Sequence, residues 1–227
     1  MDRVALAWSG GKDAAYALYQ LQSSDDYEVV ELFTTFNEEY DRSSMHGVRR
    51  PLYDRQSTAL DVPLRSVMLP SEPSNEEYNR VMAHELDRYV DRGIEHVAFA
   101  DLFLEDIRAY REAQLAETEV EGLWPVWGYD TDTLIEEMLD AGFRATVVAV
   151  DGDALGPEFA GRELDRSFLA DVPESVDPCG EHGEFHTFVR DGPPFEQPVP
   201  IEVGETVTRH VGETEIHYAD IELAESG

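Results

Sequence analysis

The chain has one cysteine and no long apolar run, and each scarcity excludes a class of protein. Cys179 is the sole cysteine among 227 residues, so the sequence holds no internal disulfide, no Cys-x-x-Cys metal site and no redox pair. No segment approaches the roughly eighteen consecutive apolar residues that a membrane span needs. Met1-Asp2-Arg3 leads directly into a predicted strand, so we expect no signal peptide and no membrane contact. The sequence therefore predicts a cytoplasmic protein.

Basic residues are also scarce. Lys and Arg together number 17 against 49 Asp and Glu, which gives a formal net charge of −32. Binding a nucleic-acid backbone needs a clustered positive face, so we expect no nucleic-acid partner. Abundant acidic residues with Arg as almost the only cation predict a halophilic, archaeal-type cytoplasm, in which salt screens the self-repulsion. An ordinary acidic protein is the alternative.

One stretch near the N-terminus combines the features of a phosphate site. An apolar run from Val4 passes through Ser9-Gly10-Gly11-Lys12-Asp13 into a predicted helix that ends near Gln22. Adjacent glycines let successive N–H groups converge on an anion at the positive end of a helix. Lys12, the only lysine, adds a point charge, and Asp13 could cap the helix or help to hold Mg²⁺. The stretch predicts nucleotide binding, with a plain strand-turn-helix corner as the alternative.

The spacing of this loop excludes two common nucleotide motifs. It is neither G-x-x-x-x-G-K-[ST], the signature of P-loop NTPases, nor G-x-G-x-x-G, the dinucleotide fingerprint.

Strand and helix patterns alternate through most of the chain, which predicts an α/β fold with a doubly wound, Rossmann-like parallel sheet. Ser74 and Glu77 form a capping box at the start of one helix. The expected strands are Glu28–Phe36, Leu64–Leu69, His96–Ala100 and Ala145–Val150, and the expected helices are Leu52–Leu60, Asn75–Arg92, Glu105–Thr118 and Thr131–Ala141.

Ligands in such sheets bind at the carboxyl ends of the strands. Thr34, Thr35 and Asp101 fall at such ends, so we expect them beside the phosphate loop, with simple strand propensity as the alternative for the two threonines. Trp124–Trp127 is a short apolar piece broken by Pro125.

Glycine, proline and short strands replace the alternation after Val150, ending in a predicted hairpin of Ile201–Val211 and Glu215–Leu223 about Gly212. We expect a domain boundary near residue 125, with a nucleotide-binding domain over residues 1–125 and a smaller α+β domain over residues 126–227.

A second dense cluster is Asp177-Pro178-Cys179-Gly180-Glu181-His182-Gly183-Glu184-Phe185-His186-Thr187-Phe188. It suits a substrate loop or a metal site, and a solvated turn leading into a strand is the bland alternative. Zinc is disfavoured because Cys179, His182 and His186 lack a convincing fourth ligand.

Several motifs together resemble a known family. Ser9-Gly10-Gly11-Lys12-Asp13 resembles the pyrophosphatase loop of the N-type ATP pyrophosphatases, the PP-loop superfamily with an adenine nucleotide alpha hydrolase-like fold. The rest resembles the diphthine–ammonia ligase family. This second likeness covers nearly the whole chain and is most specific in the cluster around Glu181. Its other motifs are Thr35-Phe36-Asn37-Glu38-Glu39, Met45-His46-Gly47-Val48-Arg49, Asp101 to Asp106, Pro125-Val126-Trp127, the Gly161 to Asp165 region and Asp191 to Phe195.

The resemblance implies ATP-dependent amidation of the diphthine carboxylate on translation elongation factor 2. Ammonium would be the nitrogen donor, an acyl-adenylate the intermediate, and AMP and pyrophosphate the products of this last step of diphthamide synthesis. ATP and Mg²⁺ are the implied cofactors, and a homodimer is left open.

The residues expected in the site fall into three groups. The catalytic candidates are Lys12, Asp13, Glu181 and Glu184, with Asp13 also the candidate Mg²⁺ ligand. The ATP-binding candidates are Ser9, Gly10, Gly11, Lys12, Asp13, Thr34, Thr35 and Asp101. The substrate-binding candidates are Asn37, Glu38, His46, Gly180, Glu181, Gly183, Glu184, His186 and Thr187.

The sequence differs from the family pattern at two positions, and other functions compete with the one that the resemblance implies. The family usually has serine where this chain has Ala14, and glycine where it has Ala100. A tRNA thiolation enzyme would need paired cysteines and a basic surface, and a glutamine-fed synthetase would need a glutaminase part. A non-catalytic ATP sensor of the same fold, or an enzyme that amidates another carboxylate, stays open.

The charge predicts a dependence of stability on salt. Because self-repulsion is screened only at high ionic strength, the melting temperature should fall as KCl is reduced from molar to millimolar concentration. Thermal unfolding followed by circular dichroism across this range tests it, and a melting temperature indifferent to KCl would contradict the halophilic interpretation.

Overall fold

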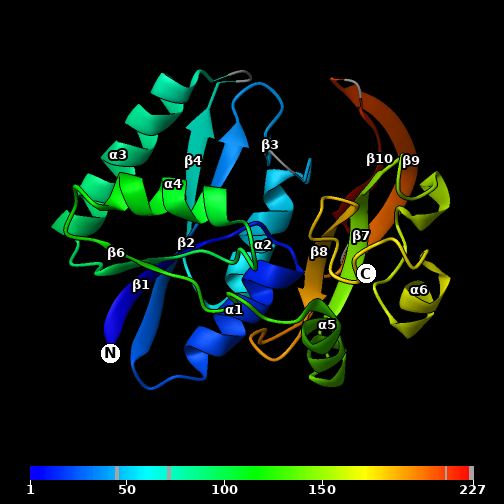
Figure 1. The fold of residues 1–227 in the computed structure, drawn as a ribbon, viewed down its shortest axis with the longest axis horizontal. Helices are drawn as coiled ribbons and strands as arrows, with labels where there is room; N and C mark the ends of the chain where they lie inside the picture. The colour runs from blue at the N-terminus through cyan, green and yellow to red at the C-terminus, as the bar shows by residue number, and fades with distance from the viewer. Residues whose placement is uncertain (44–45, 71–72, 213, 225–227) are drawn as a thin grey trace. The chain divides into compact units, whose positions relative to one another are not determined.

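The computed structural model describes residues 1–43, 46–70, 73–212 and 214–224 (Figure 1). Its contacts divide the chain into two units. The first contains Met1–Ser9, Asp13–Asp41 and Val62–Gly128, and the second contains Gly10–Lys12, Arg42–Asp61 and Tyr129–Gly227. The second unit therefore collects two segments from the N-terminal third of the chain in addition to everything after Gly128.

The first unit is built on a parallel sheet. Its strands in the described ranges are β1 (Asp2–Ala7), β2 (Tyr27–Asn37), β4 (Leu64–Leu69), β5 (His96–Ala98) and β6 (Glu121–Leu123). They pair in the order β4-β2-β1-β5-β6, and each of these pairs is parallel. This order, flanked by helices, confirms the doubly wound α/β class.

The strand order reverses beside β1. The chain first builds outward through β2 and β4, and then returns to the other side of β1 through β5 and β6. In doubly wound sheets the crevice at such a switch point, outside the carboxyl ends of the strands, is where ligands bind. We therefore expect a ligand of this unit to bind at the carboxyl ends of β1 and β5.

The helices of this unit are α1 (Lys12–Gln22), of which the contacts group Lys12 with the second unit, α3 (Asn75–Asp91) and α4 (Glu105–Leu115). The predicted capping box at α3 is present: Glu77 N–H donates to Ser74 Oγ at 3.2 Å, and Ser74 N–H donates to Glu77 Oε2 at 3.0 Å. Leu86 and Tyr89 of α3 pack with Phe33 and Val97 of the sheet in one hydrophobic cluster.

Two predicted elements run more than one residue past their ends in the structure. The strand predicted over His96–Ala100 ends at Ala98, and the helix predicted to Thr118 ends at Leu115. Strand β6 lies just before the apolar Trp124–Trp127 piece, for which the sequence predicts no regular element. Glycine at position 122 leaves room for the Trp124 ring, because a Cβ there would lie 2.4 Å from it. Trp124 folds back over β6 and stacks near Phe99, with ring centroids 5.6 Å apart, so its apolar surface caps the core.

The second unit holds an antiparallel sheet of β7 (Arg144–Asp151), β8 (Phe185–Asp191), β9 (Ile201–Val211) and β10 (Thr214–Leu223), in the order β8-β7-β10-β9. The predicted terminal hairpin is confirmed, with Gly212 at φ 66°. The sequence does not foresee the short helix α6 (Arg166–Asp171), the 3₁₀ turn Pro157–Phe159, or the full extent of β8. Helices α2 (Arg50–Leu60) and α5 (Thr131–Asp140) and the two-residue β3 (Arg42–Ser43) complete the described elements.

Ion pairs tie the Arg42–Asp61 segment to the second unit's sheet. Arg42 and Arg49 both donate to the Asp220 carboxylate on β10, and Arg49 also lies 2.8 Å from Glu222. These contacts explain why a segment that follows β2 in the chain groups with the C-terminal residues. In the described ranges no helix is both long and apolar enough to cross a membrane.

A charged network stabilises the first unit. The buried Glu85 carboxylate accepts hydrogen bonds from Arg65 Nε at 3.0 Å and Arg88 Nε at 2.8 Å. Arg88 and Arg92 in turn donate to the buried Glu31 of β2. Burial alone would raise the pKa of Glu85, but the hydrogen bonds from Arg65 and Arg88 outweigh it and lower this pKa.

A carboxyl group with a pKa lowered by folding stabilises the protein above its unfolded pKa, and this contribution is lost as pH falls through the folded value. Glu85→Gln should therefore destabilise the protein by about 2 kcal/mol at pH 7, less than for fully buried pairs because the arginines are partly exposed. The difference from wild type should shrink below about pH 4. Urea unfolding at constant salt measures it. Asp87→Asn, an exposed change on the same helix, is the control, and equal stability of Glu85→Gln and wild type at pH 7 would contradict the prediction.

Candidate active site

The segment Gly10–Lys12 is held against β8 within the second unit. Val189 N–H donates to Gly10 O at 2.8 Å. The Gln56 side chain of α2 donates from Nε2 to Gly10 O at 3.0 Å and to Val189 O at 2.6 Å. Gly10 has φ +75°, and a Cβ on it would meet the Tyr53 ring at 2.9 Å. Both the backbone conformation and the close approach therefore require glycine at this position.

Lys12 joins this loop to the second motif that the sequence singles out. Its backbone N–H donates to Thr187 Oγ1 at 3.1 Å, across 175 residues of chain. Its Nζ lies 3.7 Å from Glu181 Oε1, and the two side chains are only 4% and 10% exposed. Lys12 is also the first residue of α1, where the helix presents its positive end. The predicted candidates Gly10, Lys12, Glu181 and Thr187 thus lie together.

Two carboxylates of the Asp177–Thr187 loop stabilise its conformation by accepting hydrogen bonds from its own backbone. Glu184 accepts from Asp177 N–H at 3.1 Å and from His182 N–H at 2.9 Å. Asp177 accepts from Cys179 N–H at 2.8 Å and from the Thr131 hydroxyl at 2.9 Å. Glu184, a catalytic candidate from sequence, therefore uses both carboxylate oxygens to shape its own loop.

The glycines of this loop have left-handed backbone conformations. Gly180 has φ +68° and Gly183 has φ +88°. A Cβ on Gly180 would lie 2.8 Å from Phe185 O. Both glycine candidates are therefore needed for the turn, whatever they contact.

The predicted substrate residues His46 and His186 lie against each other in the second unit. Their rings stack with centroids 4.7 Å apart and an interplanar angle of 26°. Met45, which belongs to the motif around His46, lies outside the described residues.

Asp13 and Asp101 belong to the switch-point edge of the first unit. Asp101 follows β5, and its Oδ2 lies 3.0 Å from Arg111 Nη1. Burial is the largest influence and raises the pKa of Asp101, the negative charge of Asp13 raises it further, and Arg111 and Trp124 only partly offset this. Asp101 Oδ2 is buried without a well-aligned hydrogen bond. This edge thus brings a second acidic side chain close enough to Asp101 to affect its pKa.

This pair of carboxylates fits Mg²⁺. The ion prefers oxygen ligands and is usually held by one or two carboxylates together with substrate phosphates. Among the described residues no group of three or more His, Cys, Asp or Glu side chains is placed to hold a metal by itself. A site completed by nucleotide phosphates is consistent with both observations.

Three other candidates of the first unit make local hydrogen bonds, two through their side chains and Glu38 through its backbone. The Thr34 hydroxyl donates to Trp8 O at 2.6 Å. Asn37 Oδ1 accepts from Glu39 N–H at 2.8 Å and so forms the turn after β2, and Glu38 N–H donates to Leu69 O at 2.9 Å. The side chain of Thr35 is half-buried and that of Ser9 is exposed.

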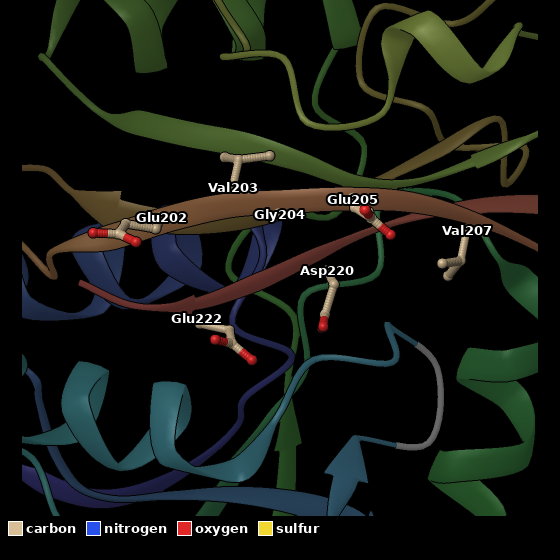
Figure 2. A pocket seen from close by; sticks show the side chains of 7 residues that line it. All are labelled: Glu202, Val203, Gly204, Glu205, Val207, Asp220 and Glu222. Atoms are coloured by element: carbon tan, nitrogen blue, oxygen red, sulfur yellow. The ribbon is translucent and has the colours of Figure 1, made fainter. Parts of the chain in front are cut away.

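A surface hollow of about 330 Å³ lies on β9 and β10 of the second unit, and none of the expected site residues lines it. Figure 2 shows its carboxylates around the strands. Because Asp220 already binds two arginines and the remaining charged lining is acidic, the hollow is unsuited to a nucleotide. Its lining is Glu202, Val203, Gly204, Glu205, Val207, Asp220 and Glu222.

Gln56 and Asp177 support the two loops but are not among the site residues expected from the sequence. A polar side chain on the apolar face of the predicted Leu52–Leu60 helix is the signal that could have pointed to Gln56. Its fully buried amide bridges two backbone carbonyls, one on each of the segments that it joins.

Gln56→Met keeps the volume but removes both hydrogen-bond donors. It should destabilise the protein by about 1–3 kcal/mol, because the Val189 carbonyl loses its donor, and should also weaken ATP binding by loosening Gly10–Lys12. Urea unfolding and calorimetric ATP titration measure the two effects. Ala59→Gly, a buried change on the same helix, should lower stability and leave ATP affinity unchanged. Identical ATP affinities for both variants and wild type would refute the positioning role.

Two family models match this chain. The model of the diphthamide synthase N-terminal domain matches residues 2–119, and that of the diphthamide synthase C-terminal domain matches residues 130–223.

Individual relatives are similar at low identity over almost the full length. A protein of Danio rerio named diphthine–ammonia ligase is 26% identical, over 90% of this chain and 88% of its own. Proteins of the same name from Bos taurus and Homo sapiens are each 23% identical, over 91% and 96% of this chain and 85% and 86% of their own. Because the two family models together match nearly the whole chain, the protein belongs to the diphthamide synthase family.

Proposed function

We propose that this protein is a diphthine–ammonia ligase, which uses ATP to amidate the diphthine carboxylate of translation elongation factor 2 with ammonium. The observation that carries the proposal is the meeting of two motifs at Lys12. The glycine loop Gly10–Lys12 and the Gly180–Thr187 loop are in contact through Lys12, which approaches Glu181 and Thr187. Such a pairing suits an enzyme that brings a nucleotide to an acyl acceptor.

The chemistry explains why ATP is consumed. A carboxylate is a poor electrophile, because the oxide that would have to leave is a poor leaving group. An oxygen of the diphthine carboxylate attacks the α phosphorus of ATP, and pyrophosphate leaves with the bonding electron pair. Ammonia then attacks the acyl carbon, AMP leaves, and one proton is released. The products are the amide, AMP and pyrophosphate.

Lys12 and the N–H groups of the glycine loop are proposed to bind the departing pyrophosphate, where negative charge builds up in the transition state. Lys12 is the sole lysine, and its small exposure limits screening by water. Ser9 is proposed as a further contact to the phosphate groups.

Asp13 and Asp101 are proposed to hold Mg²⁺, which when bound would neutralise charge on the phosphate oxygens. The burial of the Asp101 carboxylate and the nearby charge of Asp13 support this assignment. Thr34 and Thr35 are proposed to shape the end of β2 at which the nucleotide binds.

The Gly180–Thr187 loop and His46 of the second unit are proposed to bind the substrate. Asn37 and Glu38 are proposed as further substrate contacts on the strength of the family resemblance. Glu181 is the loop's best-placed carboxylate for a cation, whether ammonium or the trimethylammonium group of diphthine. Glu184 is proposed to act by shaping the loop, because its oxygens hold backbone N–H groups.

We place the reaction in the cytoplasm, where the elongation factor works. No step requires a second copy of the chain, so a homodimer is a separate proposal that light scattering would test.

Incubation with ATP, Mg²⁺, ammonium and unamidated elongation factor 2 should yield AMP and pyrophosphate in step with the amide. Lys12→Met should lower the rate by on the order of 100-fold, because it removes charge from the transition state. Arg166→Met, which removes an exposed cation of α6, is the matched control and should keep the wild-type rate.

The same assay separates the alternatives. A non-catalytic ATP sensor would bind ATP and form neither product, whereas an enzyme for another carboxylate would form both products only with that acceptor. A Lys12→Met variant that cleaved ATP at the wild-type rate would overturn the role assigned to the loop.

A further inference from the structure

Lys12, the residue proposed to bind phosphate, already lies beside an acidic side chain. Lys12 Nζ lies 3.7 Å from Glu181 Oε1, with the two side chains 4% and 10% exposed. At such low exposure the attraction between opposite charges is much stronger than between surface groups. A nucleotide phosphate that binds Lys12 must therefore compete with the Glu181 carboxylate.

The backbones of both residues are anchored, so this competition must be settled by side-chain movement. The Lys12 amide is held by Thr187 Oγ1, and Gly10 is held by Val189 and Gln56. Asp177 Oδ1 accepts the N–H of Glu181 at 3.4 Å. We therefore expect Glu181 to exchange its partner by rotation of its side chain.

We infer that Glu181 exchanges partners during the reaction, an inference that rests on the function proposed above. Glu181 neutralises Lys12 in the free protein, leaves it when nucleotide phosphate binds Lys12, and then binds ammonium. A polyphosphate carries more negative charge than a carboxylate, so it takes the lysine. The displaced carboxylate then lies beside another anion with little water, and a small cation relieves the repulsion.

This exchange gives the reaction an order. Before ATP binds, Glu181 is occupied by Lys12 and attracts ammonium weakly, so the nitrogen donor is recruited after the nucleotide. Glu181 can then accept one proton from ammonium, which leaves ammonia with the lone pair that attacks the acyl carbon. Binding of ATP and of ammonium must strengthen each other, because coupling between two sites is reciprocal.

The charge-removing variant Glu181→Gln should have opposite effects on the two ligands. ATP should bind more tightly, by about fivefold or more, because the competitor for Lys12 is gone. The KM for ammonium should rise by about tenfold or more, because its carboxylate is gone. A residue with only a structural role would weaken both.

The wild type offers a test that does not require turnover. Calorimetric titration with ATP, without acceptor protein, should give a lower dissociation constant in ammonium chloride than in sodium chloride of the same ionic strength, and Glu181→Gln should abolish this difference. Glu163→Gln removes one negative charge from the exposed Arg144–Glu163 ion pair of the same unit. This control should behave as the wild type. If Glu181→Gln fails to fold, Glu181→Asp should likewise tighten ATP binding, because its shorter side chain reaches Lys12 poorly, with a smaller rise in the ammonium KM.

Unchanged or weaker ATP binding in the folded variant would overturn the inference, as would an unchanged KM for ammonium. These outcomes are distinct from failure of the proposed function, because the ATP titration needs neither the elongation factor nor amide formation. A wild type that forms no amide yet shows the ammonium-dependent ATP affinity would refute the ligase assignment and support the exchange at Lys12.

Discussion

The hold of β8 on Gly10–Lys12 is the interaction on which the functional interpretation depends. Val189 N–H and the Gln56 amide donate to Gly10 O, and Thr187 Oγ1 accepts the Lys12 N–H, so this segment is fixed within the second unit. The residues on either side of it, β1 and nearly all of α1, belong to the first unit. Glycine at position 10 is needed because no Cβ fits against Tyr53. The result is that the only lysine of the chain lies against the Asp177–Thr187 loop.

The partners of a carboxylate decide what it does in this acidic protein. Glu85 is buried and neutralised by two arginines, and it serves stability. Glu184 binds two backbone N–H groups, and it serves the shape of a loop. Glu181 faces a lysine that the proposed chemistry needs for phosphate. Three glutamates with the same chemistry thus have three different sets of partners, and we propose a different role for each.

Features encoded locally could be predicted from the sequence, and features made by distant pairings could not. The Ser74–Glu77 capping box, the alternating strands and helices and the Gly212 hairpin each depend on neighbouring residues. The bridge made by Gln56 depends on Val189, and the grouping of Arg42–Asp61 with the second unit depends on Asp220. Sequence also gave Glu181 and Glu184 the same expected role, because nothing local distinguishes a carboxylate that faces a lysine from one that binds its own loop.

The central claim is that the glycine loop and Lys12 serve attack of a carboxylate on the α phosphorus of ATP. The most direct test is to supply elongation factor 2 whose diphthine carboxylate carries ¹⁸O and to analyse the nucleotide products by mass spectrometry. Attack by the carboxylate oxygen followed by amidation predicts one ¹⁸O atom in AMP and none in pyrophosphate. Label in inorganic phosphate with release of ADP would contradict the account, because the carboxylate would then have attacked the γ phosphorus.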